Sequence, residues 1–202
     1  MKKDYKKELK HLYAPSPKKV VLVDVPPFNY LMIDGEGDPN TSMTYQQAID
    51  ALFAVSYALK FMIKEREPAR DYRAMPLESL WWTRDRSGFS PEDRHAWQWS
   101  AMIMQPEELA LVLFEKARER VARKKDLPAL SDMYFEVLQE GQAAQIMHIG
   151  PYAAEGPTVE RIHQFIEEQG LRPMGKQHEI YLSDPRRRDP DRLNTVIRQP
   201  CR

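Results

Sequence analysis

The segment HEIYLSDP, residues 178–185, has the alternating pattern of a β-strand that runs into a turn. On such a strand His178 and Ile180 lie on one face, because neighbouring side chains point to opposite sides. Glu179 and Tyr181 lie on the other face. A carboxylate beside an aromatic ring either meets water or lines a pocket, and the rest of the sequence decides between these two interpretations.

The two halves of the chain repeat one order of elements: strand, helix, strand, strand. In the first half these elements are expected at 30–37, 44–65, 78–82 and 96–106. In the second half they are expected at 143–150, 158–170, 178–183 and 194–200. Both halves end in an apolar strand that Gln-Pro stops. We therefore expect an α+β fold of tandem, pseudo-twofold β-α-β-β repeats, with an antiparallel sheet and a ligand cleft between the repeats.

The domain boundaries follow from this repeat. Residues 1–17 are expected to be a charged N-terminal extension, and residues 18–202 a single ligand-binding domain. Within that domain, repeat one covers about 18–106 and repeat two about 130–202. A connecting helix at about 106–125 joins the two repeats.

Composition and charge exclude several classes of protein. Lys and Arg number 30, as do Asp and Glu, so the formal net charge is zero. No overall field then favours nucleic acid or an anionic membrane. Cys201 is the only cysteine, so an internal disulfide and a thiolate metal cluster are excluded. No apolar run approaches the roughly 20 residues of a membrane span, and the N-terminus lacks a signal-peptide core. We expect a soluble, cytoplasmic protein that contacts neither membrane nor nucleic acid directly.

Metal and cofactor sites find little support in the sequence. The five histidines are scattered, without a pair at the helical spacing of metal ligands, and phosphate-binding glycine motifs are lacking. We expect neither metal nor cofactor, although haem ligation by a single histidine such as His148 stays open.

The tryptophans are concentrated around the first-half strands. Trp81, Trp82, Trp97 and Trp99 lie within nineteen positions, and each ring has roughly 150–250 Å² of surface that favours burial. Trp81 and Trp82 are adjacent, so one of them must point away from the other; which one faces inward is not decided. If the repeats are related by a pseudo-twofold axis, Trp81 corresponds to Tyr181 and Ser79 to Glu179. Glu179 then faces a cleft with aromatic walls.

Six segments together carry a resemblance. They are DVPPFNYLMIDGEGDPN (24–40), YQQAIDALFAVSYALKF (45–61), MPLESLWW (75–82), MIMQP (102–106), HIGPY (148–152) and HEIYLSDP (178–185). In this order they resemble the GyrI-like small-molecule-binding family over almost the whole chain from about residue 18. One departure is Gln177, where relatives often carry a histidine.

The resemblance implies a tandem pair of β-α-β-β units with a ligand cavity at their interface. In effector-binding domains of multidrug-sensing regulators, a buried Glu at the position of Glu179 meets cationic, aromatic drugs. Stand-alone members of the family hydrolyse the cyclopropane ring of DNA-alkylating antibiotics inside an aromatic cage. The tryptophan-rich strands of this chain resemble the stand-alone type. Because only about seventeen residues precede the domain in this sequence, we expect no DNA-binding module of its own.

Three functions follow as hypotheses. The first is a cyclopropanoid hydrolase, in which Glu179 activates water with Tyr181 as the second catalytic residue. Its planar aromatic or cationic substrate would be bound by Trp81, Trp82, Trp99, Tyr72, Tyr152 and Trp97. The second hypothesis is a non-catalytic module that binds, sequesters or senses xenobiotics, with Glu179 as a counter-ion. The third is an interaction with a protein partner such as gyrase. The natural ligand and the oligomeric state are not determined by the sequence.

Overall fold

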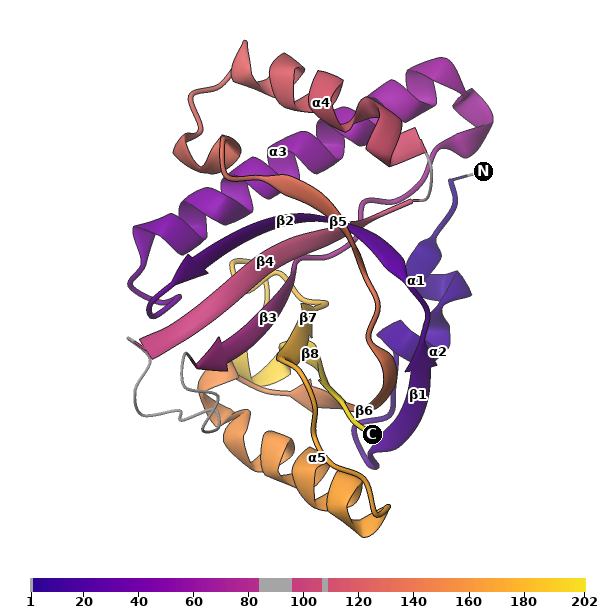
Figure 1. The fold of residues 1–202 in the computed structure, drawn as a ribbon, viewed down its shortest axis with the longest axis vertical. Coiled ribbons are helices and arrows are strands. Elements are labelled where there is room, and N and C mark those ends of the chain that lie inside the picture. Colours follow the sequence, from indigo (N-terminus) through magenta and orange to yellow (C-terminus); the bar gives the residue numbers. More distant parts are fainter. Residues whose placement is uncertain (1, 84–95, 107–108) are drawn as a thin grey trace.

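The computed structural model describes residues 2–83, 96–106 and 109–202 (Figure 1). Within these residues, eight strands form one antiparallel sheet in the order β1-β6-β8-β7-β3-β4-β2-β5. The strands are Val21–Val25 (β1), Phe28–Glu36 (β2), Glu78–Thr83 (β3), Trp97–Gln105 (β4), Tyr134–Leu138 (β5), Gly141–Ile149 (β6), Gln177–Tyr181 (β7) and Asn194–Pro200 (β8). The α-helices are Tyr5–Glu8 (α1), Lys10–Tyr13 (α2), Met43–Arg66 (α3), Leu109–Ala122 (α4) and Gly156–Glu168 (α5).

The strand order confirms the tandem repeat. The first unit is β2-α3-β3-β4 and the second is β6-α5-β7-β8. Their strands run outward from the centre of the sheet in matching order, β3-β4-β2 on one side and β7-β8-β6 on the other. The two units therefore meet at the β3–β7 pair, as pseudo-twofold symmetry requires.

The register of β3 and β7 places the symmetry axis at one residue pair. Ser79 lies directly opposite Glu179. On either side of that pair, Glu78 is opposite Ile180 and Leu80 is opposite His178, so the two flanking pairs exchange under a twofold rotation. The predicted equivalence of Ser79 and Glu179 is confirmed.

Two strands were not expected from the sequence. β1 and β5 precede β2 and β6 in the chain, and each pairs with a strand of the other unit: β1 with β6, and β5 with β2. Both are five residues long and lie at the edges of the sheet, where most of their side chains stay partly exposed. A short edge strand of this kind lacks the clear alternation that would reveal it in a sequence. Each repeat is therefore hydrogen-bonded to a strand that lies next to the other repeat in the sequence.

The two repeat helices lie over opposite ends of the sheet (Figure 1). α3 packs on β2 and β4, and α5 packs on β6 and β8. The connecting helix is present as α4, which packs on α3; residues 107–108 of the expected range lie outside the described residues. α5 begins two residues before the expected start, because Pro157 fits the first turn of a helix, where no backbone donor is needed. No helix among the described residues combines the length and apolarity needed to cross a bilayer.

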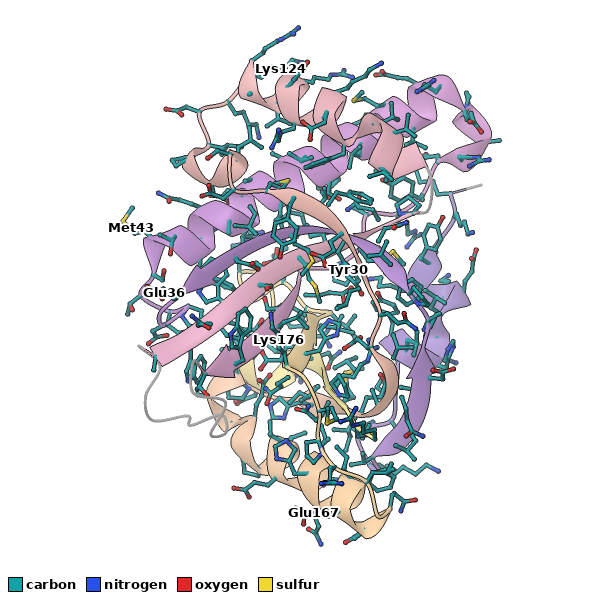
Figure 2. All side chains as sticks on the ribbon, in the orientation of Figure 1. Tyr30, Glu36, Met43, Lys124, Glu167 and Lys176 are labelled. Carbon is teal, nitrogen blue, oxygen red and sulfur yellow. The ribbon has the colours of Figure 1, made fainter. Side chains whose placement is uncertain are left out.

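The face of the sheet that carries His178 buries a balanced set of charges. His178 Nε2 lies 2.9 Å from Glu78 Oε2, and its Nδ1 lies 3.0 Å from Glu140 Oε1. Arg198 Nη1 donates to Glu140 Oε2 at 2.9 Å. Tyr13 and Tyr30 donate to the two oxygens of Glu78, at 2.9 and 3.2 Å. Tyr30 is labelled in Figure 2. Because Tyr13 belongs to α2, this network also holds the N-terminal helices against both repeats.

Protonation of His178 should make the stability of the protein depend on pH. The carboxylates of Glu140 and Glu78 oppose the effect of burial and raise the pKa of His178 from 6.5 to about 9. A raised pKa stabilises the folded state fully below pH 6.5, and this contribution is lost as the pH rises through about 9. Urea unfolding of the wild type should therefore show a loss of stability in this range that His178→Gln lacks. His163→Gln, outside the network, should keep the wild-type slope; equal slopes for all three proteins would contradict the assignment.

A second prediction concerns Gly35, which lies opposite Trp99 in the β2–β4 pair. A Cβ atom at Gly35 would clash with the indole of Trp99, because three carbons of the indole would lie inside normal contact distance of it. Gly35→Ala should therefore lower the free energy of unfolding by about 1–3 kcal/mol, as overpacking does. Gly156→Ala is the matched control, because no heavy atom lies within 4 Å of its added Cβ. An unchanged melting temperature for Gly35→Ala would show that the indole moves freely.

Candidate functional site

A large cavity lies against the two central strands. Its walls come from β3, β4 and β7 on the sheet side, and from α3, α5 and the segment 151–155 on the other. The cavity volume is about 1810 Å³, well above the roughly 300–1,000 Å³ of a typical small-molecule site. The odd-numbered residues of β7 point into it, as their alternation predicts: Gln177, Glu179 and Tyr181.

Glu179 is held rigidly at the centre of this wall. Its side chain is only 7% exposed. Oε1 accepts a hydrogen bond from Gln177 Nε2 at 2.7 Å, and Oε2 accepts one from the Tyr181 hydroxyl at 2.8 Å. Trp81 Nε1 in turn donates to the Tyr181 oxygen at 3.1 Å. Burial raises the pKa of Tyr181 well above its usual value, so the phenol stays protonated and donates a hydrogen bond to Glu179.

A second acid shares the site with Glu179. Glu155 comes directly before α5, is 6% exposed and lines the same cavity. Burial raises the pKa of both carboxyl groups, that of Glu155 far more, and the charge of Glu179 adds to the effect on Glu155. Two adjacent buried carboxylates cannot both ionise cheaply. Because the pKa of Glu155 is raised far more, the environment favours one proton on Glu155 beside an ionised Glu179.

The segment that carries Glu155 is fixed by His148. Its Nδ1 lies 2.9 Å from Thr158 Oγ1, and its Nε2 lies 3.4 Å from the Pro151 carbonyl oxygen. Burial lowers the pKa of His148, so the ring is neutral, donates through Nε2 and accepts through Nδ1. Both nitrogens thus have partners within this part of the chain. Gly150 takes φ +143° beside this ring, a backbone conformation that favours glycine.

The aromatic walls pack edge to face around the acids. Trp81 and Trp97 have ring centroids 5.5 Å apart at 64°, and Tyr152 and Tyr181 have centroids 5.4 Å apart at 74°. Tyr45 of α3 lies 5.6 Å from Trp81 and shares a hydrogen bond of 2.8 Å with Ser79. Such arrangements are the favourable ones for aromatic pairs, and they fix the shape of the wall.

The structure brings together five of the eight residues expected at the site. Those that line the cavity are Glu179, Tyr181, Trp81, Trp97 and Tyr152. It also decides between the adjacent tryptophans, because Trp81 faces the cavity and Trp82 faces the other side of the sheet. There Lys176 Nζ lies 3.3 Å from the centroid of the Trp82 ring, and Trp82 Nε1 donates to Gln98 at 2.6 Å.

The other two expected residues lie away from the cavity surface. Trp99 is 1% exposed and packs beneath Tyr45, with ring centroids 4.9 Å apart, so it supports the wall from behind. Tyr72 is buried beside Tyr5 of α1, with centroids 6.2 Å apart. Its position follows from the bridge between Lys3 and Tyr72, which draws this part of the chain to the N-terminus.

Sequence reasoning missed Glu155 and Tyr45. Tyr45 could have been found, because it begins the apolar face of a helix and is aromatic like the strand residues that it meets. Glu155 gave no comparable signal, since it lies in an irregular segment before a helix. Among the residues that the structure describes, no cluster of three or more histidine, cysteine or acidic side chains could hold a metal ion.

Comparisons with known proteins agree with this geometry. The GyrI-like small molecule binding domain family matches residues 18–201, whereas a search of curated proteins gave no match. An uncharacterized conserved protein from Listeria innocua is 38% identical, with both chains fully covered and a TM-score of 0.91. A protein from Listeria innocua described as a hydrolase is 36% identical, also with full coverage of both chains, and has a TM-score of 0.86.

A more distant structure shares the fold. The C-terminal domain of EcmrR is 12% identical, covers 91% of this chain and 97% of its own, and has a TM-score of 0.56. The match of the family model over nearly the whole chain, together with the cavity between the two repeats, shows which family the chain belongs to. This chain belongs to the GyrI-like family of small-molecule-binding domains.

Proposed function

We propose that this protein hydrolyses the cyclopropane ring of planar, DNA-alkylating compounds that it binds in its aromatic cavity. The observation that carries the proposal is the buried acid pair of Glu179 and Glu155 inside walls of tryptophan and tyrosine. The 36% identical protein described as a hydrolase gives further support.

Binding would place a flat substrate among the rings. Trp81 and Trp97 form one wall and Tyr152 another, so a planar compound gains stacking contacts and loses its water shell. Excluding bulk water strengthens the electrostatic interaction between Glu179 and the bound substrate. The substrate then shares a dry compartment with one ionised and one protonated carboxyl group.

Hydrolysis of a cyclopropane fused to a conjugated dienone adds one water molecule. The water oxygen bonds to the methylene carbon of the three-membered ring as one carbon–carbon bond of that ring breaks. The released electron pair enters the conjugated system, which becomes aromatic and leaves negative charge on the former carbonyl oxygen. Glu179 takes a proton from the attacking water, and the phenoxide receives one.

The acid pair supplies both proton transfers. Glu179 is ionised and accepts a proton, while Glu155 is neutral and donates one. After one turnover Glu179 is protonated and Glu155 is ionised. A proton passed through their mutual hydrogen bond restores the starting state. Tyr181 and Gln177 hold Glu179 in place throughout.

A non-catalytic binder is the second candidate. It is favoured by the charge of Glu179 beside stacked rings, which suits a cationic aromatic ligand. A cation over such a ring gains about 0.5–2 kcal/mol. Glu179 would then be a counter-ion, and Glu155 would have no chemical role.

Replacement of Glu179 separates the two candidates. Glu179→Gln should lower turnover of a cyclopropane-bearing alkylator by about 10²–10⁴-fold, while tryptophan-fluorescence titration shows affinity within about threefold of wild type for an uncharged planar substrate. Mass spectrometry of the recovered compound detects the added water. Glu160→Gln, an exposed acid on the rim of the same cavity, should leave turnover unchanged. Full turnover by Glu179→Gln would remove this residue from the mechanism, and recovery of unchanged compound from the wild type would favour the binder.

The pH profile tests the division of labour within the pair. Turnover should fall at low pH as Glu179 is protonated, at a pH above the usual range for a carboxyl group, because burial raises its pKa. Turnover should fall again at high pH as Glu155 loses its proton. The pKa of Glu155 is raised well above 4.5, so this loss occurs at a higher pH than for an ordinary carboxyl group. Glu155→Gln should lower turnover at every pH and leave a profile that has the acid limb but no alkaline limb. A flat alkaline limb in the wild type would exclude Glu155 as the proton donor.

A further inference from the structure

We propose that the site takes an elongated ligand, whose second planar unit lies on a row of side chains along α3. The inference rests on the proposed small-molecule site and adds to it the shape of the ligand: one planar unit at Glu179, and another well outside the aromatic walls.

The row consists of every fourth residue of α3. Its members all line the cavity: Tyr45, Ile49, Phe53, Tyr57 and Phe61. Four residues advance a helix by about 6 Å, so Tyr45 and Phe61 are separated by roughly 24 Å along the axis. Four of the five side chains carry a six-membered aromatic ring, and the rings of Phe53 and Tyr57 have centroids 6.5 Å apart.

Exposure rises steadily along this row. Tyr45 is 8% exposed, Ile49 and Phe53 are partly buried, and Tyr57 and Phe61 are 47% and 51% exposed. The geometry of the helix explains the gradient, because four residues turn it by about 400°, and the row drifts by about 40° at each step. It therefore starts at the sheet and ends at the rim. A ligand that follows it leaves the buried acids and emerges at the surface.

Beyond its outer aromatic rings the row meets charged groups. Glu65, one step beyond Phe61, lines the cavity and pairs with Arg120 Nη1 at 3.3 Å, and Lys124 and Lys125 also line the cavity. The inner end carries the ionised Glu179. A matching ligand thus has a cationic or hydrogen-bonding group at its inner end and a polar group that accepts hydrogen bonds at its outer end.

One ligand can contact both the row on α3 and the acid pair, because both line one continuous cavity of about 1810 Å³. A compound confined to the aromatic walls would leave most of that volume to water. Exposed aromatic side chains that adjoin a cavity are a mark of binding. Other exposed apolar residues behave differently: Met43 points away from the body at the start of α3 (Figure 2), and Leu111 and Val112 of α4 do not line the cavity.

Two fluorescent probes of different length test the inference. The long probe is a bisbenzimidazole dye with a piperazine at one end and a phenol at the other. The short probe is a phenylbenzimidazole that carries the same piperazine but lacks one ring system. Both supply the cation for Glu179, and only the long one reaches Tyr57 and Phe61. Affinities are measured by fluorescence titration of the full chain.

The double variant Tyr57→Ser with Phe61→Ser removes the exposed rings. It should weaken binding of the long probe by about tenfold, equivalent to about 1.4 kcal/mol, and change binding of the short probe by less than about twofold. The matched control is Leu111→Ser with Val112→Ser, which removes apolar side chains that are 61% and 65% exposed elsewhere. This control should bind both probes like the wild type.

The outcomes separate the inference from the proposed function. If the short probe binds and the long probe loses nothing in the double variant, the row is no subsite and the inference is overturned, while the acid site stands. If neither probe binds the wild type, the small-molecule site itself fails. Sedimentation of the same variants completes the test, because a change of assembly state in the double variant would make the row an interface between chains instead.

Discussion

The antiparallel pairing of β3 with β7, with Ser79 opposite Glu179, is the constraint on which the rest of the structure depends. It places the pseudo-twofold axis at one residue pair, and alternation along both strands then assigns every neighbour to a face. A shift of one residue would move Glu179 into the buried network and His178 into the cavity. The chemistry of the site is therefore a consequence of strand register, which the hydrophobic residues on both faces hold in place.

The two faces of the sheet at the β3–β7 pair bury their charged groups in different ways. On one face, Glu78 and Glu140 meet His178 and Arg198, so negative and positive groups balance and their hydrogen-bonding atoms find partners. Such a network is costly to break, because removing one partner leaves an uncompensated charge. On the other face the acids have only neutral donors such as Tyr181 and Gln177. A charge that the protein leaves without a counter-ion is available to a ligand, and this asymmetry distinguishes the buried network from the face of the candidate site.

The sequence was sufficient for features that depend on local periodicity. The alternation of 178–183 and the helical period of 44–65 predicted their elements within a few residues, and the internal repeat predicted the equivalence of Ser79 and Glu179. Features set by long-range contacts could not be predicted. Periodicity shows that Trp81 and Trp82 oppose each other, but the face that becomes the cavity depends on where α3 and α5 pack. Glu155 reaches the site only because the turn after β6 folds back over β7, and no local pattern encodes that approach.

The presence of a second acid bears on whether the cavity only binds or also catalyses. A counter-ion site for a cation needs one carboxylate, and Glu179 provides it. Burial and the charge of Glu179 raise the pKa of Glu155, so this second acid is neutral and adds no charge for a cation, and a pure binder gains nothing from burying it. Hydrolysis of an electrophile needs a base and an acid at once, and groups whose pKa values are pushed apart by their surroundings fill these roles. This is our reason for proposing proton transfer at the acid pair and not recognition of charge alone.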